Sequence, residues 1–277
     1  MLVQQIGYTT MKEPSLKKHA LIVSVVLAFC SQGCTEVADA VFQEKLEQAF
    51  QLEPNATVEI ANVNGRIDVT AWDRTEASLM IFKRANEKAD FEKVRIDIVA
   101  KPERLSIEAR YPQSGLSWFR RNSALVDFEL KVPRGVSLKR ISSVNGSVRL
   151  QGVQGSVNAS TVNGELAATG LAGDASLSTV NGSIEAEFED FANVKTVNVE
   201  TVNGSVSVTI PNNANATVTA TTVNGRISAA EPLRSNIQKS RRGKLEGVLG
   251  NGTSKVNVST VNGAVSINLT SSAFARP

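Results

Sequence analysis

The stretch VNGSVRLQG-VQGSVNAST-VNGELAATG-LAGDASLST-VNGSIEA, residues 144–186, decides the fold because it repeats with a step of nine residues. Each block has glycine at its third position, and apolar side chains recur at three other positions. The first column is Val148, Val157, Leu166, Ala175 and Ile184; the second is Leu150, Ala159, Ala168, Leu177 and Ala186; the third is Val144, Val153, Val162, Leu171 and Val180. A fixed short period is typical of repeat proteins with stacked units.

Two all-β architectures are compatible with this step. In an antiparallel meander, each glycine would belong to a two-residue hairpin turn, for which Asn-Gly is the strongest signal. Alternation along the strands would then leave the third column on the outer face. In a β-solenoid, the chain bends at each glycine corner and can turn that column inward as well. We favour the solenoid and predict a parallel β-helix-like stack with all three columns buried.

The corners alternate between Val-Asn-Gly, at residues 144, 162 and 180, and a different tripeptide, Val-Gln-Gly at 153 or Leu-Ala-Gly at 171. The true repeat is therefore an 18-residue coil with two strands. The tripeptide Val-Asn-Gly occurs seven times, and its later spacings of 22 and 21 residues keep nearly the same coil length. Stacked corners would let the asparagine side chains hydrogen-bond along a ladder. Asn tolerates and Gly readily adopts the left-handed conformation, so we expect structural turns here. These are Asn64, Gly65, Asn145, Gly146, Asn163, Gly164, Asn181, Gly182, Asn203, Gly204, Asn224, Gly225, Asn262 and Gly263.

Two structural regions are expected to follow the leader in the chain. Residues 45–140 contain short alternating strand patterns and are expected to form a β-rich N-terminal cap, because an uncovered solenoid end is an unpaired sheet edge. Residues 141–270 are expected to form the solenoid, in coils of about 18–22 residues. An insertion at residues 231–250 should project from its side.

The first forty residues have the layout of an export signal. Three lysines precede an apolar run over residues 20–30 that is too short for a permanent membrane span: Lys12, Lys17 and Lys18. Met11 is a second candidate start, because the ten residues before it add nothing to this layout. The pattern predicts a signal peptide over residues 1–33.

The end of this leader is compatible with two cleavage sites. Ser31-Gln32-Gly33-Cys34 resembles a bacterial lipobox, although Ser31 stands where Leu is usual, and Cys34 would carry the lipid. The Ala-Asp-Ala at residues 38–40 fits ordinary signal peptidase, so cleavage after residue 40 is the alternative. An uncleaved anchor is the third option. We expect an exported protein of the cell envelope, lipid-anchored on its periplasmic or outer-membrane face, or secreted.

The residue types exclude several catalytic mechanisms from the folded part. Both cysteines, Cys30 and Cys34, and the single histidine, His19, lie in or at the end of the leader. Beyond them the chain has no imidazole or thiol for a triad, a Cys-His dyad or a histidine-based zinc site. Without residues 1–33 the net charge falls from +3 to +1, which indicates no nucleic-acid partner. We predict no cofactor, no metal site and no enzyme.

Acidic residues of the coils are the remaining candidates for catalysis, because β-helices also serve as polysaccharide-active enzymes, which need clustered carboxylates. They are Glu165, Asp174, Glu185, Glu187, Glu189 and Asp190. We expect them to face solvent, with Glu165 and Asp174 on opposite faces. The cluster at residues 185–190 is also a weak calcium candidate, although the turns lack the Asp of calcium-binding nonapeptides.

Two segments that break the repeat are candidate binding surfaces. The insertion is basic, which suits docking to a membrane or an anionic glycan, and carries Arg234, Lys239, Arg241, Arg242 and Lys244. An expected loop combines aromatic and basic side chains, which suit a membrane interface or a partner: Trp118, Phe119, Arg120 and Arg121. The structural alternatives are a solvated excursion for the first and an aromatic plug of the core end for the second.

Several motifs, taken together, resemble a known family. The Val-Asn-Gly repeats, NGRIDV at residues 64–69 followed by AWD at 71–73, and VPR at 132–134 are similar to the DUF4097 family of candidate adhesins, over about residues 50–270. The resemblance implies a β-solenoid similar to a parallel β-helix and an exported or lipid-anchored protein. It implies no catalytic residues.

The expected function is therefore that of a non-enzymatic envelope protein that presents a repetitive surface, as an adhesin or binding module. Its ligand would be a glycan, an envelope component or another cell. The alternative is an envelope scaffold or stress-associated protein that binds only protein partners. A polysaccharide-active β-helix enzyme is the third hypothesis.

Overall fold

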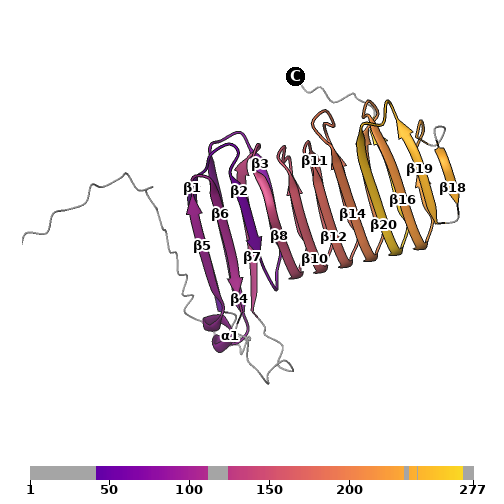
Figure 1. The fold of residues 1–277 in the computed structure, drawn as a ribbon. Helices are drawn as coiled ribbons and strands as arrows, with labels where there is room; N and C mark the ends of the chain where they lie inside the picture. The colour runs from indigo at the N-terminus through magenta and orange to yellow at the C-terminus, as the bar shows by residue number, and fades with distance from the viewer. Residues whose placement is uncertain (1–41, 112–123, 234–236, 242, 271–277) are drawn as a thin grey trace, which may run out of the picture.

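Two long β-sheets enclose one core in the computed structural model, which describes residues 42–111, 124–233, 237–241 and 243–270 (Figure 1). Sheet A has ten strands in the order β1 (Phe42–Gln51), β4 (Glu76–Ala85), β7 (Leu125–Pro133), β3 (Ile67–Trp72), β9 (Val148–Gln151), β11 (Leu166–Leu171), β13 (Ile184–Phe188), β15 (Val206–Pro211), β21 (Val265–Thr270) and β17 (Ile227–Ala229). Sheet B has eleven in the order β18 (Ile237–Arg241), β19 (Lys244–Leu249), β16 (Ala216–Asn224), β20 (Ser254–Asn262), β14 (Thr196–Asn203), β12 (Ala175–Asn181), β10 (Val157–Asn163), β8 (Ser137–Asn145), β2 (Thr57–Ala61), β6 (Arg104–Arg110) and β5 (Arg95–Lys101).

A single short helix, α1 (Lys88–Lys93), is found in the described residues, between β4 and β5 in the chain. It has no buried residue, so it contributes little to the core. Within the described part of the chain, no helix has the length and apolar character that crossing a membrane requires.

Consecutive strands of the repeats alternate between the two sheets. β10 pairs in parallel with β12, with Val157 opposite Ala175, and β11 pairs in parallel with β13, with Leu166 opposite Ile184. Each partner lies 18 residues along the chain, so equivalent repeat positions stand side by side. The parallel register excludes the antiparallel meander and gives a solenoid-like stack.

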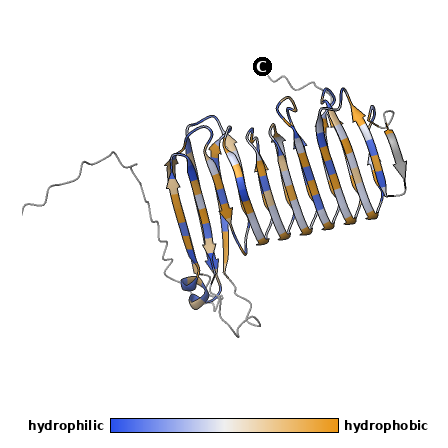
Figure 2. Cartoon of the chain, viewed as in Figure 1, coloured by the Kyte–Doolittle hydropathy of each residue, from blue (hydrophilic) through white to orange (hydrophobic). Residues whose placement is uncertain are grey.

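The first two apolar columns fill the space between the sheets. Their side chains are buried, from Val148 and Leu150 through Leu177 to Ile184. Figure 2 shows apolar and polar bands alternating along the strands, as a period of two residues requires. The buried residues form one continuous cluster from Phe50 to Ile267, so the core runs through the whole stack.

The third column is not buried as a whole, and this part of the prediction is wrong. Val153 and Leu171 are fully buried, but the valines of the Val-Asn-Gly corners are 39–40% exposed: Val144, Val162 and Val180. β10 continues as far as Asn163, so alternation along this strand points Thr161 inward and the following valine outward. The corner is a continuation of the strand rather than a bend that turns the valine inward.

Stacking explains how these valines are tolerated at the surface. Val202 and Val261 have a valine neighbour in each adjacent coil and are 40% exposed. Val223 lies beside Val261 on one side, whereas the pairing of β16 with β19 on its other side ends at Thr221. Its exposure rises to 73%. Each valine therefore covers much of the next, and the column is partly self-buried.

The last coil is inserted out of chain order. β20 lies between β14 and β16 in sheet B (Figure 1). β21 lies between β15 and β17 in sheet A. The three strands β14, β16 and β20 of sheet B all end in Thr-Val-Asn, and each is followed by a partner strand in sheet A. The repeat itself therefore does not specify which coil stacks on which. The antiparallel pairing of β19 with β16 occupies the outer edge of β16 and leaves its other edge for β20.

The insertion at residues 231–250 does not project from the side, so that expectation is corrected. It contains the antiparallel pair β18–β19, which extends sheet B beyond β16. Its leucines face the core, because Leu245 and Leu249 are buried and Leu233 is fully buried. A Cβ at Gly247 would lie 2.7 Å from Leu233 Cδ1, so the hairpin closes tightly over this end of the core.

The N-terminal region continues the same two sheets. β2 pairs in parallel with β8, with Ile60 opposite Ile141, and β3 pairs with β9, with Ile67 opposite Val148. Beyond this coil, antiparallel strands extend each sheet: β4 and β1 in sheet A, and β5 in sheet B. The edge strand β5 carries three charged residues, an arrangement that protects open edges from aggregation: Arg95, Asp97 and Lys101.

Candidate functional site

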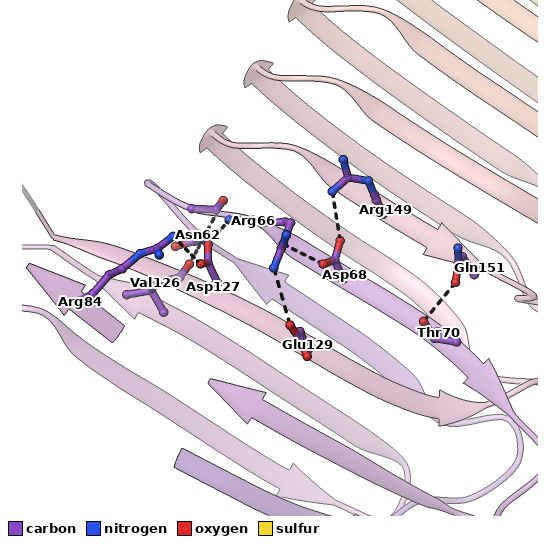
Figure 3. Close-up of polar contacts among 11 residues, drawn as sticks. Asn62, Arg66, Asp68, Thr70, Arg84, Val126, Asp127, Glu129, Arg149 and Gln151 are labelled. Atoms are coloured by element: carbon purple, nitrogen blue, oxygen red, sulfur yellow. Dashed lines mark hydrogen bonds and ion pairs between the residues drawn. The ribbon is translucent and has the colours of Figure 1, made fainter. Parts of the chain in front are cut away.

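Charged side chains gather on the outer face of sheet A where β7, β3 and β9 lie side by side (Figure 3). Strand pairing aligns two rows across these strands: Glu129, Asp68 and Arg149, and next to it Lys131, Thr70 and Gln151. On the following strand, β11, the same positions carry the smaller Ala167 and Thr169. The chemistry of the outer face therefore changes where the regular repeats begin.

Arg66 holds the two carboxylates of the first row together. Glu129 and Asp68 stand opposite each other on paired strands, a placement that is destabilising for like charges. The Arg66 Nε lies 2.8 Å from Asp68 Oδ2, and its Nη2 lies 3.6 Å from Glu129 Oε1. Arg149 Nη1 approaches Asp68 Oδ1 more loosely, at 3.8 Å. One guanidinium thus bridges the two carboxylates (Figure 3).

The corner beside this row is fixed by hydrogen bonds to β7. Asp127 Oδ1 accepts the backbone N–H of Arg66 at 2.8 Å, and Asp127 Oδ2 pairs with Arg84 at 3.0 Å. The buried Asn62 donates its Nδ2–H to the carbonyl of Val126 at 2.8 Å. Asn62 stands where other corners have Ser or Thr, and this departure is the sequence signal for the special corner.

Two grooves cross this face. The first, of about 830 Å³, is lined by Lys45, Arg66, Phe82, Arg84, Asp127 and Glu129, together with Gln43, Glu44 and Lys83. The second, of about 300 Å³, is lined by Asp68, Thr70, Glu129, Lys131, Arg149 and Gln151, with Val69 and Leu130 at its floor. They share Glu129, and we call them together the charged furrow. It crosses β1, β4, β7, β3 and β9, which at a strand spacing of about 4.8 Å gives a length of roughly 19 Å.

Two lysines of the charged furrow contact aromatic rings instead of carboxylates. Lys45 Nζ lies 5.5 Å from the centre of the Phe82 ring, and Lys131 Nζ lies 5.7 Å from that of Trp72. Neither lysine has a carboxylate within 4.0 Å among the described residues. Trp72 donates its indole N–H to the Glu76 carbonyl at 2.8 Å, and Arg74 Cζ lies 4.7 Å from the centre of its ring. The two lysines are available to an anionic ligand.

The burial of Lys83 at the first groove lowers the pKa of its ammonium, and the nearby Glu44 carboxylate opposes this. Lys83 Nζ also lies 4.3 Å from the centre of the Phe91 ring of α1. This lysine therefore belongs to the packing of the helix more than to the open part of the furrow.

Two motifs that carry the family resemblance meet in space. Trp72 pairs with Pro133 across β3 and β7, and the next residues, Asp73 and Arg134, form an ion pair with Nε–Oδ1 at 2.6 Å. The hydrogen bond from Arg134, followed by its charge, lowers the pKa of the exposed Asp73 carboxyl. The sequence separation of 61 residues hides this contact. The AWD and VPR segments thus hold β3 and β7 together beside the charged furrow.

The asparagines of all seven Val-Asn-Gly corners form one hydrogen-bonded ladder. Each side-chain Nδ2–H donates to the Oδ1 of the next asparagine, at 2.8–2.9 Å, in the order Asn224, Asn262, Asn203, Asn181, Asn163, Asn145, Asn64. At one end, the Tyr111 hydroxyl donates to the Asn64 carbonyl at 3.0 Å, and burial raises the Tyr111 pKa to about 12. The predicted ladder is confirmed, and its role is structural.

The reason for glycine at these corners differs from the expected left-handed conformation. No described non-glycine residue has a positive φ, and Gly65 is the only corner glycine that does. A Cβ at Gly164 would instead lie 2.1 Å from the carbonyl oxygen of Gly146 in the adjacent coil. Thr161 donates its hydroxyl to this same carbonyl at 2.9 Å. Close contact between coils, not the left-handed region, requires glycine here.

The acidic residues of the coils are dispersed. Glu165, Glu185, Glu187, Glu189 and Asp190 are exposed, which confirms that they face solvent. Asp174 instead accepts the backbone N–H groups of Lys195 at 2.6 Å and Thr196 at 2.9 Å, so it fixes the start of β14. In the described residues, no group of three or more acidic, His or Cys side chains is arranged to hold a metal ion.

Of the residues predicted for binding, the described structure places three, and it sets two of them, Arg241 and Lys244, opposite each other across β18 and β19. The backbone of Lys239 and Arg241 lies in β18, and Lys244 begins β19 with its Nζ 4.0 Å from Glu246. Several predictions lie outside the described residues: Arg234, Arg242, Trp118, Phe119, Arg120, Arg121, the leader and Cys34. The charged furrow was missed, because the alternation in β3, β7 and β9 shows which residues face out but not which strands are neighbours.

Comparison with solved structures gives distant likenesses. A protein of Clostridium sporogenes ATCC 15579, provisionally described as a cell adhesion protein, is 15% identical with a TM-score of 0.49, covering 81% of this chain and 99% of its own. A provisional adhesin of Bacteroides fragilis NCTC 9343 is 12% identical with a TM-score of 0.37, covering 84% and 98%. A provisional lipid-binding protein of Parabacteroides distasonis ATCC 8503 is 12% identical with a TM-score of 0.32, covering 82% and 96%. No curated protein matches the sequence.

The family assignment rests on most of the chain. The family model described as Toastrack DUF4097 matches residues 46–268, which include every Val-Asn-Gly corner and all of the charged furrow except its β1 residues Gln43, Glu44 and Lys45. The resemblance drawn from the repeats and from the AWD and VPR segments is confirmed. The chain belongs to the Toastrack DUF4097 family.

Proposed function

We propose that this protein is a non-enzymatic binding module of the cell envelope, which holds an extended polar ligand, an envelope glycan, in the charged furrow. The observation that carries the proposal is the concentration of charged and amide side chains across five neighbouring strands of sheet A. The 18–22-residue coils provide a rigid support for this face.

The shape of the furrow favours an extended ligand. Small molecules are usually held in enclosed, mainly apolar pockets. The charged furrow is open and runs across the strands, and most of the residues that line it are charged or polar, with Arg149, Gln151 and Thr70 at one end and Lys45 at the other. A chain of sugar units can contact several of these groups at once.

The arrangement of the carboxylates favours binding over hydrolysis. A glycosidase needs two carboxyl groups about 5–10 Å apart, on either side of the bond that is cleaved. Asp68 and Glu129 stand opposite each other on paired strands, and Arg66 contacts both, at 2.8 and 3.6 Å. The guanidinium thus occupies the space in which the substrate would have to sit.

Binding to a panel of purified envelope polysaccharides tests the proposal. We expect the double variant Arg149→Ala/Gln151→Ala to bind at least tenfold more weakly than the unaltered protein. The control is Glu185→Ala/Glu187→Ala, which removes two exposed side chains from β13 of the same sheet. Equal affinity of the three proteins would contradict a role of the furrow. Absence of glycan binding together with a co-purifying envelope protein would favour the scaffold hypothesis.

The location in the envelope has its own test. Mass spectrometry of the mature protein is expected to find a lipid-modified Cys34 at the N-terminus. A free N-terminus at Val41 would show the alternative cleavage and a secreted protein. An intact N-terminus at Met1 or Met11 would contradict export by signal cleavage.

A further inference from the structure

The charged furrow contains more cations than anions. Lys83, which packs on α1, and its paired neighbour Glu44 aside, five basic side chains line its two grooves, Lys45, Arg66, Arg84, Lys131 and Arg149, against three acidic ones, Asp68, Asp127 and Glu129. The excess of two positive charges contrasts with the chain as a whole, in which basic and acidic residues are nearly balanced. A ligand with negative charge would neutralise this local excess of positive charge.

The excess positive charge of the furrow lies on particular side chains. Arg66 and Arg84 have carboxylate partners at 2.8 and 3.0 Å. Lys131 has only the Trp72 ring, and Arg149 reaches Asp68 only at 3.8 Å. Lys131 on β7 pairs with Thr70 on β3, whereas Arg149 on β9 pairs with Asp68 and therefore stands diagonally from Thr70 on its other side. An anionic group above Thr70 would be approached by a cation from each side.

Groups that recognise hydroxyls surround the same position. Thr70 Oγ1 and Gln151 Oε1 are 3.5 Å apart, a separation at which their mutual hydrogen bond is weak. The Gln151 amide N–H groups and the Thr70 hydroxyl are therefore free to bond a sugar hydroxyl. The Trp72 ring is contacted by Lys131 Nζ at 5.7 Å and more closely by Arg74, whose Cζ lies 4.7 Å from the ring centre, so a further cation stands beside this position. Charge and hydroxyl contacts occur together.

On this basis, and resting on the proposed function, we propose that the charged furrow binds a carboxylated polysaccharide, with one uronic acid carboxylate held between Lys131 and Arg149. The nearby Asp68 and Glu129 limit the charge that the site accepts, so a singly charged carboxylate suits it better than a dense sulfate or phosphate polymer. The roughly 19 Å length of the furrow accommodates several sugar units.

The test measures the affinity of the full chain for three polymers: polygalacturonate, neutral dextran and dextran sulfate. We expect polygalacturonate to bind most tightly, and its affinity to fall as salt is raised, because exposed charges are screened. Lys131→Gln/Arg149→Gln should weaken this binding at least tenfold. The matched control, Lys195→Gln/Lys255→Gln, removes the same charge from two exposed lysines at the strand starts of sheet B.

Each result decides one point. An equal loss in the two double variants would show non-specific attraction and overturn the proposed site. Equal binding of dextran would overturn the anionic ligand and leave a glycan-binding function intact, and tighter binding of dextran sulfate would overturn the carboxylate. No binding of any polymer would overturn both this inference and the glycan function. Unchanged thermal unfolding of the variants excludes misfolding as the cause of a loss.

Discussion

The regular coils from β8 to β15 and the N-terminal strands β1 to β7 share two sheets and one core but use their outer faces differently. In the coils, the polar side chains that recur serve the stack itself: Asn163 continues the ladder, and Thr161 binds the Gly146 carbonyl. Outward positions such as Lys131 in the N-terminal region, and Arg149 in the coil strand that borders it, are not needed for stacking. The comparison teaches that repetition in this protein encodes architecture, whereas departures from it supply the chemistry.

The largest expected effect tests whether the core really is continuous. Leu166→Asp should lower the free energy of unfolding by at least about 4 kcal/mol, because a charge would enter the core without a partner. Ile67 stands in the same row, through Val148, and Ile67→Asp should cost as much. Urea unfolding measures both variants, and Ala167→Asp, on the outer side of β11, is the control.

This experiment can also break the comparison. If Ile67→Asp unfolded the N-terminal strands and left the coils intact, two transitions would appear in the urea curve. The N-terminal region would then be a separate folding unit, contrary to the single cluster of buried residues. One shared transition is the expected result.

The next effect contrasts two corner glycines. Gly164→Ala should cost about 1–3 kcal/mol, because the added Cβ would collide with the Gly146 carbonyl oxygen and push two coils apart. Gly65→Ala meets the Val126 carbonyl oxygen at 2.3 Å and in addition has a φ of +117°. It should therefore cost about 1 kcal/mol more. Thermal unfolding in which Gly164→Ala is the more damaging variant would contradict this explanation.

The parts of the fold that sequence predicts are those that depend on local repetition. The columns of Leu166 and Leu177 and the ladder of Asn163 follow from a fixed step, since equal residues at equal steps come side by side once the coils stack in parallel. The outward turn of Val162 was missed because it depends on how far β10 continues through the corner. Hydrogen bonds decide whether an 18-residue coil bends before or after a residue such as Val162, and periodicity does not reveal these bonds.

The charged furrow lies beyond this kind of prediction for a different reason. Asp68, Glu129 and Arg149 come from strands separated by 61 and 81 residues, and the pairing of β3 with both β7 and β9 brings them together. The same limit applies to β20, whose place beside β14 and β16 depends on the β18–β19 hairpin. Because the repeats are equivalent, several different orders of stacking would make almost the same local interactions.

A smaller effect is expected within the ladder. Asn163→Ala removes one hydrogen bond donated to Asn145 and one accepted from Asn181, so it should cost about 1–3 kcal/mol. Asn224→Ala, at the end of the ladder, removes only the bond to Asn262 and should cost about half as much. Chemical denaturation compares them. Equal costs would mean that the ladder adds little and that backbone pairing holds the corners.

The smallest expected effect separates the two kinds of corner at one repeat position. Val162 and Val153 are nine residues apart in the same sequence column, but the first is 40% exposed and the second fully buried. Val162→Asp should cost less than about 1 kcal/mol, since its carboxylate can reach water. Val153→Asp should cost several kcal/mol, since its carboxylate cannot. Urea unfolding of this pair tests the register directly. If Val162→Asp were as damaging as Val153→Asp, the valine column would be buried in solution, and an uncharged partner surface or a different corner geometry would have to cover it.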